Sequence, residues 1–172
     1  KFIVNARSLK WGEQVLISHS RDVLLYGASV VCMCFYEFGQ STTFERRIEM
    51  AERAYHLLVD KLGMNPLDII FDPNVLAIAT GMEEHDNYAV EFIRATEWIH
   101  QNLPGAHVSG GVSNLSFSFR GNTYIREAIH CVFLHHAQQV GMDFGIVNAK
   151  ARMDYNKIPE EQLQLIEDVV LN

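Results

Sequence analysis

The sequence is poor in cysteine and contains no pattern of a disulfide framework. Three cysteines in 172 residues are an odd number, so reduced cysteines in a cytoplasmic protein are expected. Cys32 and Cys34 stand two apart in the apolar run ASVVCMCF, which puts both on one face of a strand. This pattern favours core packing over metal binding or redox chemistry at the pair.

Positive charge and long apolar runs are also scarce. Lys and Arg number 14 against 21 Asp and Glu, which gives a net charge of -7. Such a balance argues against nucleic acid or an anionic membrane as the main partner. No apolar run approaches the length of a membrane span, and the first residues lack the pattern of a signal peptide. The chain begins inside an expected strand without an initiator Met, which suggests an excised domain.

The common nucleotide and metal motifs are missing as well. No Walker sequence occurs, and Gly110-Gly111 does not belong to a dinucleotide-binding fingerprint. His130, His135 and His136 fall on one expected helix, but their spacings of five and six do not stack two imidazoles on one face. We therefore expect no metal in this chain and interpret these histidines as partly buried or surface residues.

What is present is a regular alternation of strand-like and helix-like segments. Short apolar segments predict strands at residues 2–4, 28–35, 68–71, 106–109 and 143–147. Apolar residues at helical spacing predict helices at residues 13–26, 42–62, 86–103, 122–140 and 159–170. Strict alternation predicts an α/β fold of one domain with parallel strands and right-handed crossovers. On this pattern alone, a doubly wound open sheet is favoured over part of a barrel, because a full (β/α)8 barrel needs about 250 residues.

Polar side chains recur where the predicted strands end. Besides the pair Tyr36-Glu37, these side chains are Asn5, Asp72, Asn114 and Asn148. Each one alone is more often a turn or cap residue, but the repetition favours a pocket at the carboxyl ends of parallel strands. A carboxylate can accept two parallel hydrogen bonds from the N–H/NH2 edge of a flat heterocycle such as a pterin, and amides recognise ring nitrogens and carbonyls.

Five stretches carry a resemblance to a known family. They are IIFDPN (69–74), ATGMEEHDNYA (79–89), SGGVSNLSFSFRG (109–121), REAIHCVFLHHA (126–137) and GMDFGIVNA (141–149). Through them the chain resembles the pterin-binding domain of cobalamin-dependent methionine synthase over essentially its whole length. The resemblance implies a (β/α)8 TIM barrel, of which residues 1–172 would form a single pterin-binding domain fragment, the fourth to eighth βα units. This expectation replaces the open sheet.

The resemblance also implies a methyltransferase activity. The family binds 5-methyltetrahydrofolate and transfers its methyl group from N5 to cob(I)alamin, which another domain of the same enzyme holds. It implies folate contacts at Asn5, Asp72, Asn114 and Arg120, and we count Asn148 with them as a further amide at a strand end. Asp72 would hold the amino edge of the pterin. Asn114 would lie near N5 as the catalytic residue.

The chemistry of methyl transfer suits an amide at position 114. The methyl group leaves a tertiary amine, and an amine anion is a very poor leaving group, so N5 must gain a proton or a hydrogen bond as the bond breaks. By rotating, the amide of Asn114 can present its donor or its acceptor and can thus serve both states of N5.

Some positions depart from the family pattern, and two alternatives stay open. Tyr36 and Phe38 replace a carboxylate and a polar residue, Arg7 adds charge near Asn5, and Lys150 replaces a glycine. One alternative is a non-catalytic folate-binding or structural fragment, whose open sheet edges would invite self-association. The other is a condensation like that of dihydropteroate synthase, although the SNLSFSFRG and GMDFGIVNA stretches favour the methyltransferase.

Overall fold

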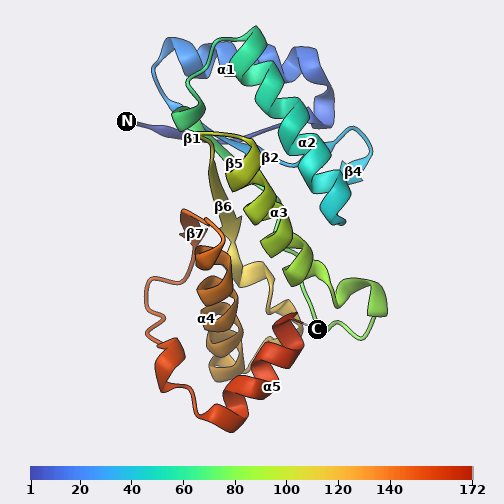
Figure 1. The fold of residues 1–172 in the computed structure, drawn as a ribbon, viewed down its shortest axis with the longest axis vertical. Coiled ribbons are helices and arrows are strands. Elements are labelled where there is room, and N and C mark those ends of the chain that lie inside the picture. The colour runs from blue at the N-terminus through green and yellow to red at the C-terminus, as the bar shows by residue number, and fades with distance from the viewer. Residues whose placement is uncertain (172) are drawn as a thin grey trace.

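The computed structural model describes residues 1–171, and a sheet of five parallel strands forms its centre. The strands are β1 (Ile3–Ser8), β2 (Ser29–Met33), β5 (Ile69–Asp72), β6 (His107–Gly111) and β7 (Phe144–Ile146). The main helices are α1 (Glu13–Leu25), α2 (Phe44–His56), α3 (Tyr88–Asn102), α4 (Thr123–Gln139) and α5 (Glu160–Leu171). A small hairpin of β3 (Phe35–Tyr36) and β4 (Gly39–Gln40) follows β2. Figure 1 shows the main strands following one another down the molecule, with α4 and α5 together at its lower end.

The strand order identifies the sheet as part of a barrel. Its order is β1-β2-β5-β6-β7, so each strand pairs in parallel with the next main strand along the chain. A doubly wound sheet reverses its strand order at a switch point, whereas a (β/α)8 barrel adds its strands in sequence. The α/β fold and the partial barrel are therefore confirmed, and the doubly wound sheet that the pattern alone favoured is wrong.

Several element boundaries differ from the sequence expectations. β1 continues to Ser8, because its polar residues pair with β2 through a register shift between Asn5 and Arg7. The second helix ends its α-helical part at His56, and Leu57–Lys61 form a π-helical turn. The third helix begins at Tyr88, because the acidic segment before it forms a separate 3₁₀ turn.

One face of the sheet packs against the helices. The residues on this face are at most 1% exposed: Val30, Cys32, Phe71 and Val108. Gly110 continues the same row, and a Cβ there would lie 2.9 Å from Phe92 of α3 and 2.9 Å from Val75. Only glycine lets this helix pack so closely against the sheet.

The opposite face, which we call the inner face, is the side that would line a barrel. The strand register places Asn5, Val31, Ile70 and His107 in one row across it. Asp72 lies two residues further along β5, so its side chain points to the same face. Within residues 1–171, β1 and β7 are the two edge strands, each with a neighbour on one side only. Ile146, in the edge strand β7, is 63% exposed.

The cysteines behave as core residues. All three are free thiols, and Cys32 and Cys34 are buried. Burial raises the pKa of Cys32 to about 12, so this thiol stays protonated at neutral pH. Core packing at this pair is thus confirmed.

Within residues 1–171, no helix is long and apolar enough to cross a membrane. In the same part of the chain, no group of three or more His, Cys, Asp and Glu side chains is arranged to hold a metal ion.

Candidate functional site

Asp72 provides a buried carboxylate at the carboxyl end of a central strand. It is the last residue of β5 and is 8% exposed. Its Oδ1 accepts a hydrogen bond of 2.8 Å from the backbone N–H of Asn74, and no other hydrogen bond to this carboxylate occurs within residues 1–171. Burial raises the pKa of Asp72 to about 6, although the Asn74 N–H and the charge of Arg47 act in the opposite direction. At neutral pH this group is an ionised carboxylate whose second oxygen accepts no hydrogen bond within residues 1–171.

A strained turn follows this carboxylate. Pro73 has no N–H for the ladder and ends the strand. Asn74 then takes a positive φ of 71°, which few residues other than glycine adopt at low cost. Its backbone oxygen accepts a hydrogen bond of 3.2 Å from Arg47, and its buried side-chain Nδ2 has no partner in the described chain. The turn is held through the backbone of Asn74, whose oxygen bonds to Arg47 and whose N–H bonds to Asp72.

Asn114 presents a free amide beside the end of β6. It ends a 3₁₀ turn, Val112–Asn114, and is half-buried. A Cβ on Gly111 would lie 3.4 Å from the Asn114 Nδ2, an ordinary van der Waals distance, so the amide lies close to the end of β6. No hydrogen bond to this side chain occurs in the part of the chain that the structure describes, which leaves its donors and its acceptor to a ligand.

The loop that carries Asn114 is tied to α4 through Ser116. The Oγ of Ser116 is fully buried and lies 2.9 Å from Arg126 Nε and 2.7 Å from His130 Nε2. Arg126 also donates through Nη2 to the backbone oxygen of Ser113 at 3.2 Å. Because Arg126 donates to the hydroxyl, the hydroxyl proton is free to donate to His130. Burial and then the Arg126 charge lower the pKa of His130, which keeps the imidazole neutral as that acceptor.

A polar cavity of about 280 Å³ lies between this loop, α4 and the loop after β7. Its lining includes Ser113, Thr123, Arg126, Glu127, His130 and Asn148. Asn148 is exposed, and its Oδ1 accepts a hydrogen bond of 3.0 Å from the backbone N–H of Lys150. The cavity thus brings Asn148 and the Asn114 loop to one space.

The lining of this cavity does not include the other predicted site residues, which are Asn5, Asp72, Asn114 and Arg120. Asn5 is exposed within β1, not at its end, and shares the inner face with Asp72. Arg120 is exposed, and its guanidinium lies 4.6 Å from the ring centroid of Phe117. It forms no ion pair within residues 1–171, so its charge is open to an anionic group.

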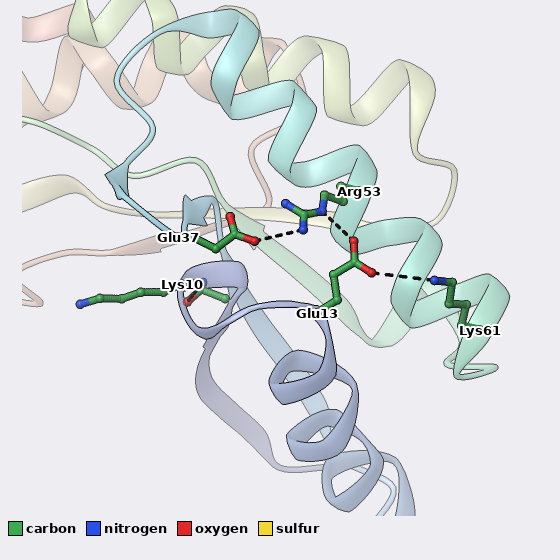
Figure 2. Close-up of polar contacts among 6 residues, drawn as sticks. Lys10, Glu13, Glu37, Arg53 and Lys61 are labelled. Carbon is green, nitrogen blue, oxygen red and sulfur yellow. Dashed lines mark hydrogen bonds and ion pairs between the residues drawn. The ribbon is translucent and has the colours of Figure 1, made fainter.

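Glu37, at the tip of the β3–β4 hairpin, is engaged outside this site. Its carboxylate accepts from Arg53 Nη2 at 3.0 Å, and Arg53 Nε also donates to Glu13 at 2.9 Å. Figure 2 shows Arg53 between the two carboxylates, with Glu13 continuing to Lys61 at 3.9 Å. A backbone hydrogen bond and then Arg53 lower the pKa of Glu37. This carboxylate anchors the hairpin to α1 and α2.

Sequence reasoning missed Arg126 and Arg47, and it interpreted His130 only as a partly buried or surface histidine. Arg126 and His130 are four residues apart in REAIH, which puts them on one face of α4. That spacing was a signal that could have linked them. Arg47 carried no such signal, because the groups it bonds are far away in the sequence.

A known family matches most of this chain. The family described as pterin binding enzyme matches residues 3–148 of this chain. The matched segment runs from the start of β1 to Asn148 and includes both Asp72 and Asn114.

Proposed function

This chain belongs to the pterin binding enzyme family, and from that premise we propose that it binds 5-methyltetrahydrofolate and presents the N5 methyl group to cob(I)alamin held by another domain of a cobalamin-dependent methionine synthase. The observation that carries the proposal is the buried Asp72 carboxylate, with one oxygen unengaged, at a strand end of the inner face. A cytoplasmic location fits the free, buried thiols of Cys32 and Cys34.

In this proposal Asp72 holds the pterin by its N–H/NH2 edge. An ionised carboxylate accepts two parallel hydrogen bonds, and a partly desolvated site strengthens them. With a pKa of about 6, Asp72 is charged at neutral pH. Burial raises this pKa because the protonated form costs less to desolvate than the charged form. Asn5, on the same face, would supply an amide to the ring.

Asn114 acts on N5 as the methyl group leaves. A corrinoid held by the other domain would accept the methyl group as a methyl cation. The electrons of the broken N–C bond stay on N5, which takes a proton from solvent to give tetrahydrofolate. The Asn114 amide donates to N5 while that charge develops, and its unpaired state within residues 1–171 leaves it free to rotate between donor and acceptor.

The polar cavity is suited to the benzoyl-glutamate end of folate. Arg126, half-buried in α4, keeps Nη1 unengaged among the described residues, and Arg120, on the loop before α4, offers an exposed guanidinium outside the cavity lining. Guanidinium groups bind carboxylates as charge-assisted, bidentate partners. Asn148 would add an amide to this wall of the site.

The proposal is tested by titrating the full-length protein with 5-methyltetrahydrofolate in a calorimeter and then adding cob(I)alamin. We expect saturable binding followed by formation of tetrahydrofolate. Binding without methyl transfer would support the non-catalytic alternative. Condensation of a dihydropterin pyrophosphate with p-aminobenzoate, without turnover of the methylated folate, would support the alternative that resembles dihydropteroate synthase. Absence of pterin binding would refute the proposal.

Replacing Arg126 by methionine is expected to weaken the binding of 5-methyltetrahydrofolate about tenfold, because a charge-assisted hydrogen bond contributes about 1.5–3 kcal/mol. The comparison ligand is 5-methyltetrahydropterin, which lacks the benzoyl-glutamate and should bind equally well to both proteins. Arg21→Met, on the exposed surface of α1, is the matched control. If both ligands lost affinity equally, Arg126 would contact the pterin or stabilise the loop, and it would not bind the glutamate.

A further inference from the structure

Arg47 is a fully buried cation that the proposed chemistry does not use. It lies in α2, is 0% exposed, and is the largest of the fully buried side chains. Burial lowers its pKa to about 10, so it remains charged at neutral pH. A buried charge is retained only where strong interactions compensate for its lost hydration.

Those interactions are hydrogen bonds to three backbone oxygens from three segments. Arg47 Nε donates to Ser41 O at 3.3 Å, Nη1 donates to Tyr88 O at 3.3 Å, and Nη2 donates to Asn74 O at 3.2 Å. Ser41 precedes α2, Asn74 follows β5, and Tyr88 begins α3. The rigid fork of the guanidinium suits such a bridge, because its donors point in fixed and different directions.

The contact with Asn74 connects Arg47 to the carboxylate of the site. Asn74 has its backbone oxygen bonded to Arg47 and its N–H bonded to Asp72 Oδ1 at 2.8 Å. Its φ of 71° is a conformation that persists when surrounding contacts hold it. The chain of contacts Arg47, Asn74, Asp72 therefore runs without a gap from the buried cation to the strand end.

We propose that Arg47 is a positioning residue that fixes the Asp72 carboxylate for a pterin ligand by holding the backbone of Asn74. The ligand in this statement rests on the proposed function, whereas the link from Arg47 to Asp72 does not. The three carbonyl contacts keep the turn after β5 in place relative to the starts of α2 and α3, so that Asp72 keeps one oxygen bonded and the other open.

Few other charges face this pair. The titratable groups around Arg47 are Cys34, Tyr88, Glu91 and Asp72. Burial raises the pKa of Cys34 and keeps it neutral. Glu91 bonds to the backbone N–H of Phe44 and to Arg94, the latter at 3.1 Å. Asp72 is therefore the acid of the site whose pKa the charge of Arg47 lowers, against the effect of burial.

The test uses two variants that separate charge from geometry in the full-length protein. Arg47→Lys keeps the charge but loses the fork, whereas Arg47→Gln keeps two donors but loses the charge. Arg46→Gln is the matched control, since the neighbouring Arg46 is exposed and contacts Glu49 and the ring of Tyr36. Two measurements without ligand are made on each protein: the NMR titration of the Asp72 carboxyl group and the hydrogen exchange of the Asn74 amide.

We expect Asp72 to titrate near pH 6 in the unmodified protein, and at higher pH in Arg47→Gln. Arg47→Lys should leave that midpoint nearly unchanged but should accelerate exchange at Asn74, while exchange in β5 stays slow. Both variants should bind 5-methyltetrahydrofolate about tenfold more weakly, as expected for the loss of a charged hydrogen bond. Arg46→Gln should change none of these quantities.

Unchanged Asp72 titration and unchanged Asn74 exchange in either folded variant would overturn the proposal. Loss of folding in both variants would also overturn it, in favour of a purely structural role. Because these two measurements need no ligand, they remain decisive if the unmodified protein binds no pterin, which would refute only the proposed function.

Discussion

Replacing Asp72 by asparagine is expected to abolish the binding of 5-methyltetrahydrofolate and, at the same time, to stabilise the fold at neutral pH. The loss of binding follows from chemistry. Asparagine presents an NH2 group where the pterin edge also presents donors, so two donors would face each other in a buried site. Leaving buried donors unpaired costs about 1–3 kcal/mol for each group, which lowers affinity by about 30-fold or more when two are affected.

The gain in stability follows from the raised pKa. The carboxyl group of Asp72 has a pKa of about 6 in the folded protein against an ordinary value of 3.8. As the pH rises from 3.8 to about 6, the unfolded chain loses this proton before the folded one does, so this group makes folding progressively less favourable. Above that window the penalty is complete at about 3 kcal/mol, and asparagine, whose oxygen can still accept from the Asn74 N–H, removes most of it.

The measurements are calorimetric titration with folate and urea unfolding of the full-length protein on both sides of this pH window. The stabilisation by Asp72→Asn should be present at neutral pH and vanish near the ordinary pKa of 3.8. Asp22→Asn, an exposed position on α1, serves as the control for the chemical change itself. Equal stability of Asp72→Asn and the unmodified protein at neutral pH would contradict the raised pKa, and retained folate affinity would contradict the role of the carboxylate.

Asp72 is a site residue that could be predicted from the sequence. The stretch DPN after a short apolar segment predicts the end of a strand, because proline ends the ladder, and it places a carboxylate at that end. Likewise, the apolar run around Cys32 and Cys34 predicted a buried strand, which the structure confirms. These features depend on neighbours in the sequence, so the sequence alone contains them.

The arrangement of the strands was harder to predict. The periodicity of apolar residues predicts that strands and helices alternate, but it does not predict which strands are neighbours. Both a doubly wound sheet and a segment of a barrel have this alternation. The pairing of each strand with the next one depends on how the helices pack on a single face, for which Gly110 leaves space. The family resemblance supplied the barrel where the pattern favoured the other sheet.

The support of the site was not predictable, because its contacts join distant segments. Arg47 bonds to residues 41, 74 and 88, and nothing in RRIEMAERAY distinguishes it from the exposed Arg46 beside it. Glu37 looked like a strand-end carboxylate for the pocket, but Arg53, sixteen residues further along the chain, engages it. A charged side chain's role is decided by partners that only the folded chain brings near.

Asn114 differs from Asp72 in that its removal should affect the reaction far more than the binding. Asn114→Ala deletes an amide that has no hydrogen bond within residues 1–171, so the fold loses little and the pterin keeps its contact with Asp72. The leaving N5 loses its donor at the stage where charge develops. Removal of one such preorganised donor lowers kcat by about 100- to 1,000-fold.

Single-turnover methyl transfer from bound folate to cob(I)alamin measures this step directly, beside a folate titration of the same preparation. We expect the rate of transfer in Asn114→Ala to fall about 100-fold or more, while the dissociation constant changes only a few-fold. Asn102→Ala is the matched control, because Asn102 is an exposed residue whose amide bonds to Trp98 O at the end of α3. A second variant, Asn114→Asp, can donate to N5 only when protonated, so its residual rate should increase as the pH falls. A rate that falls only as much as the affinity does would make Asn114 a binding residue and assign protonation of N5 to another donor.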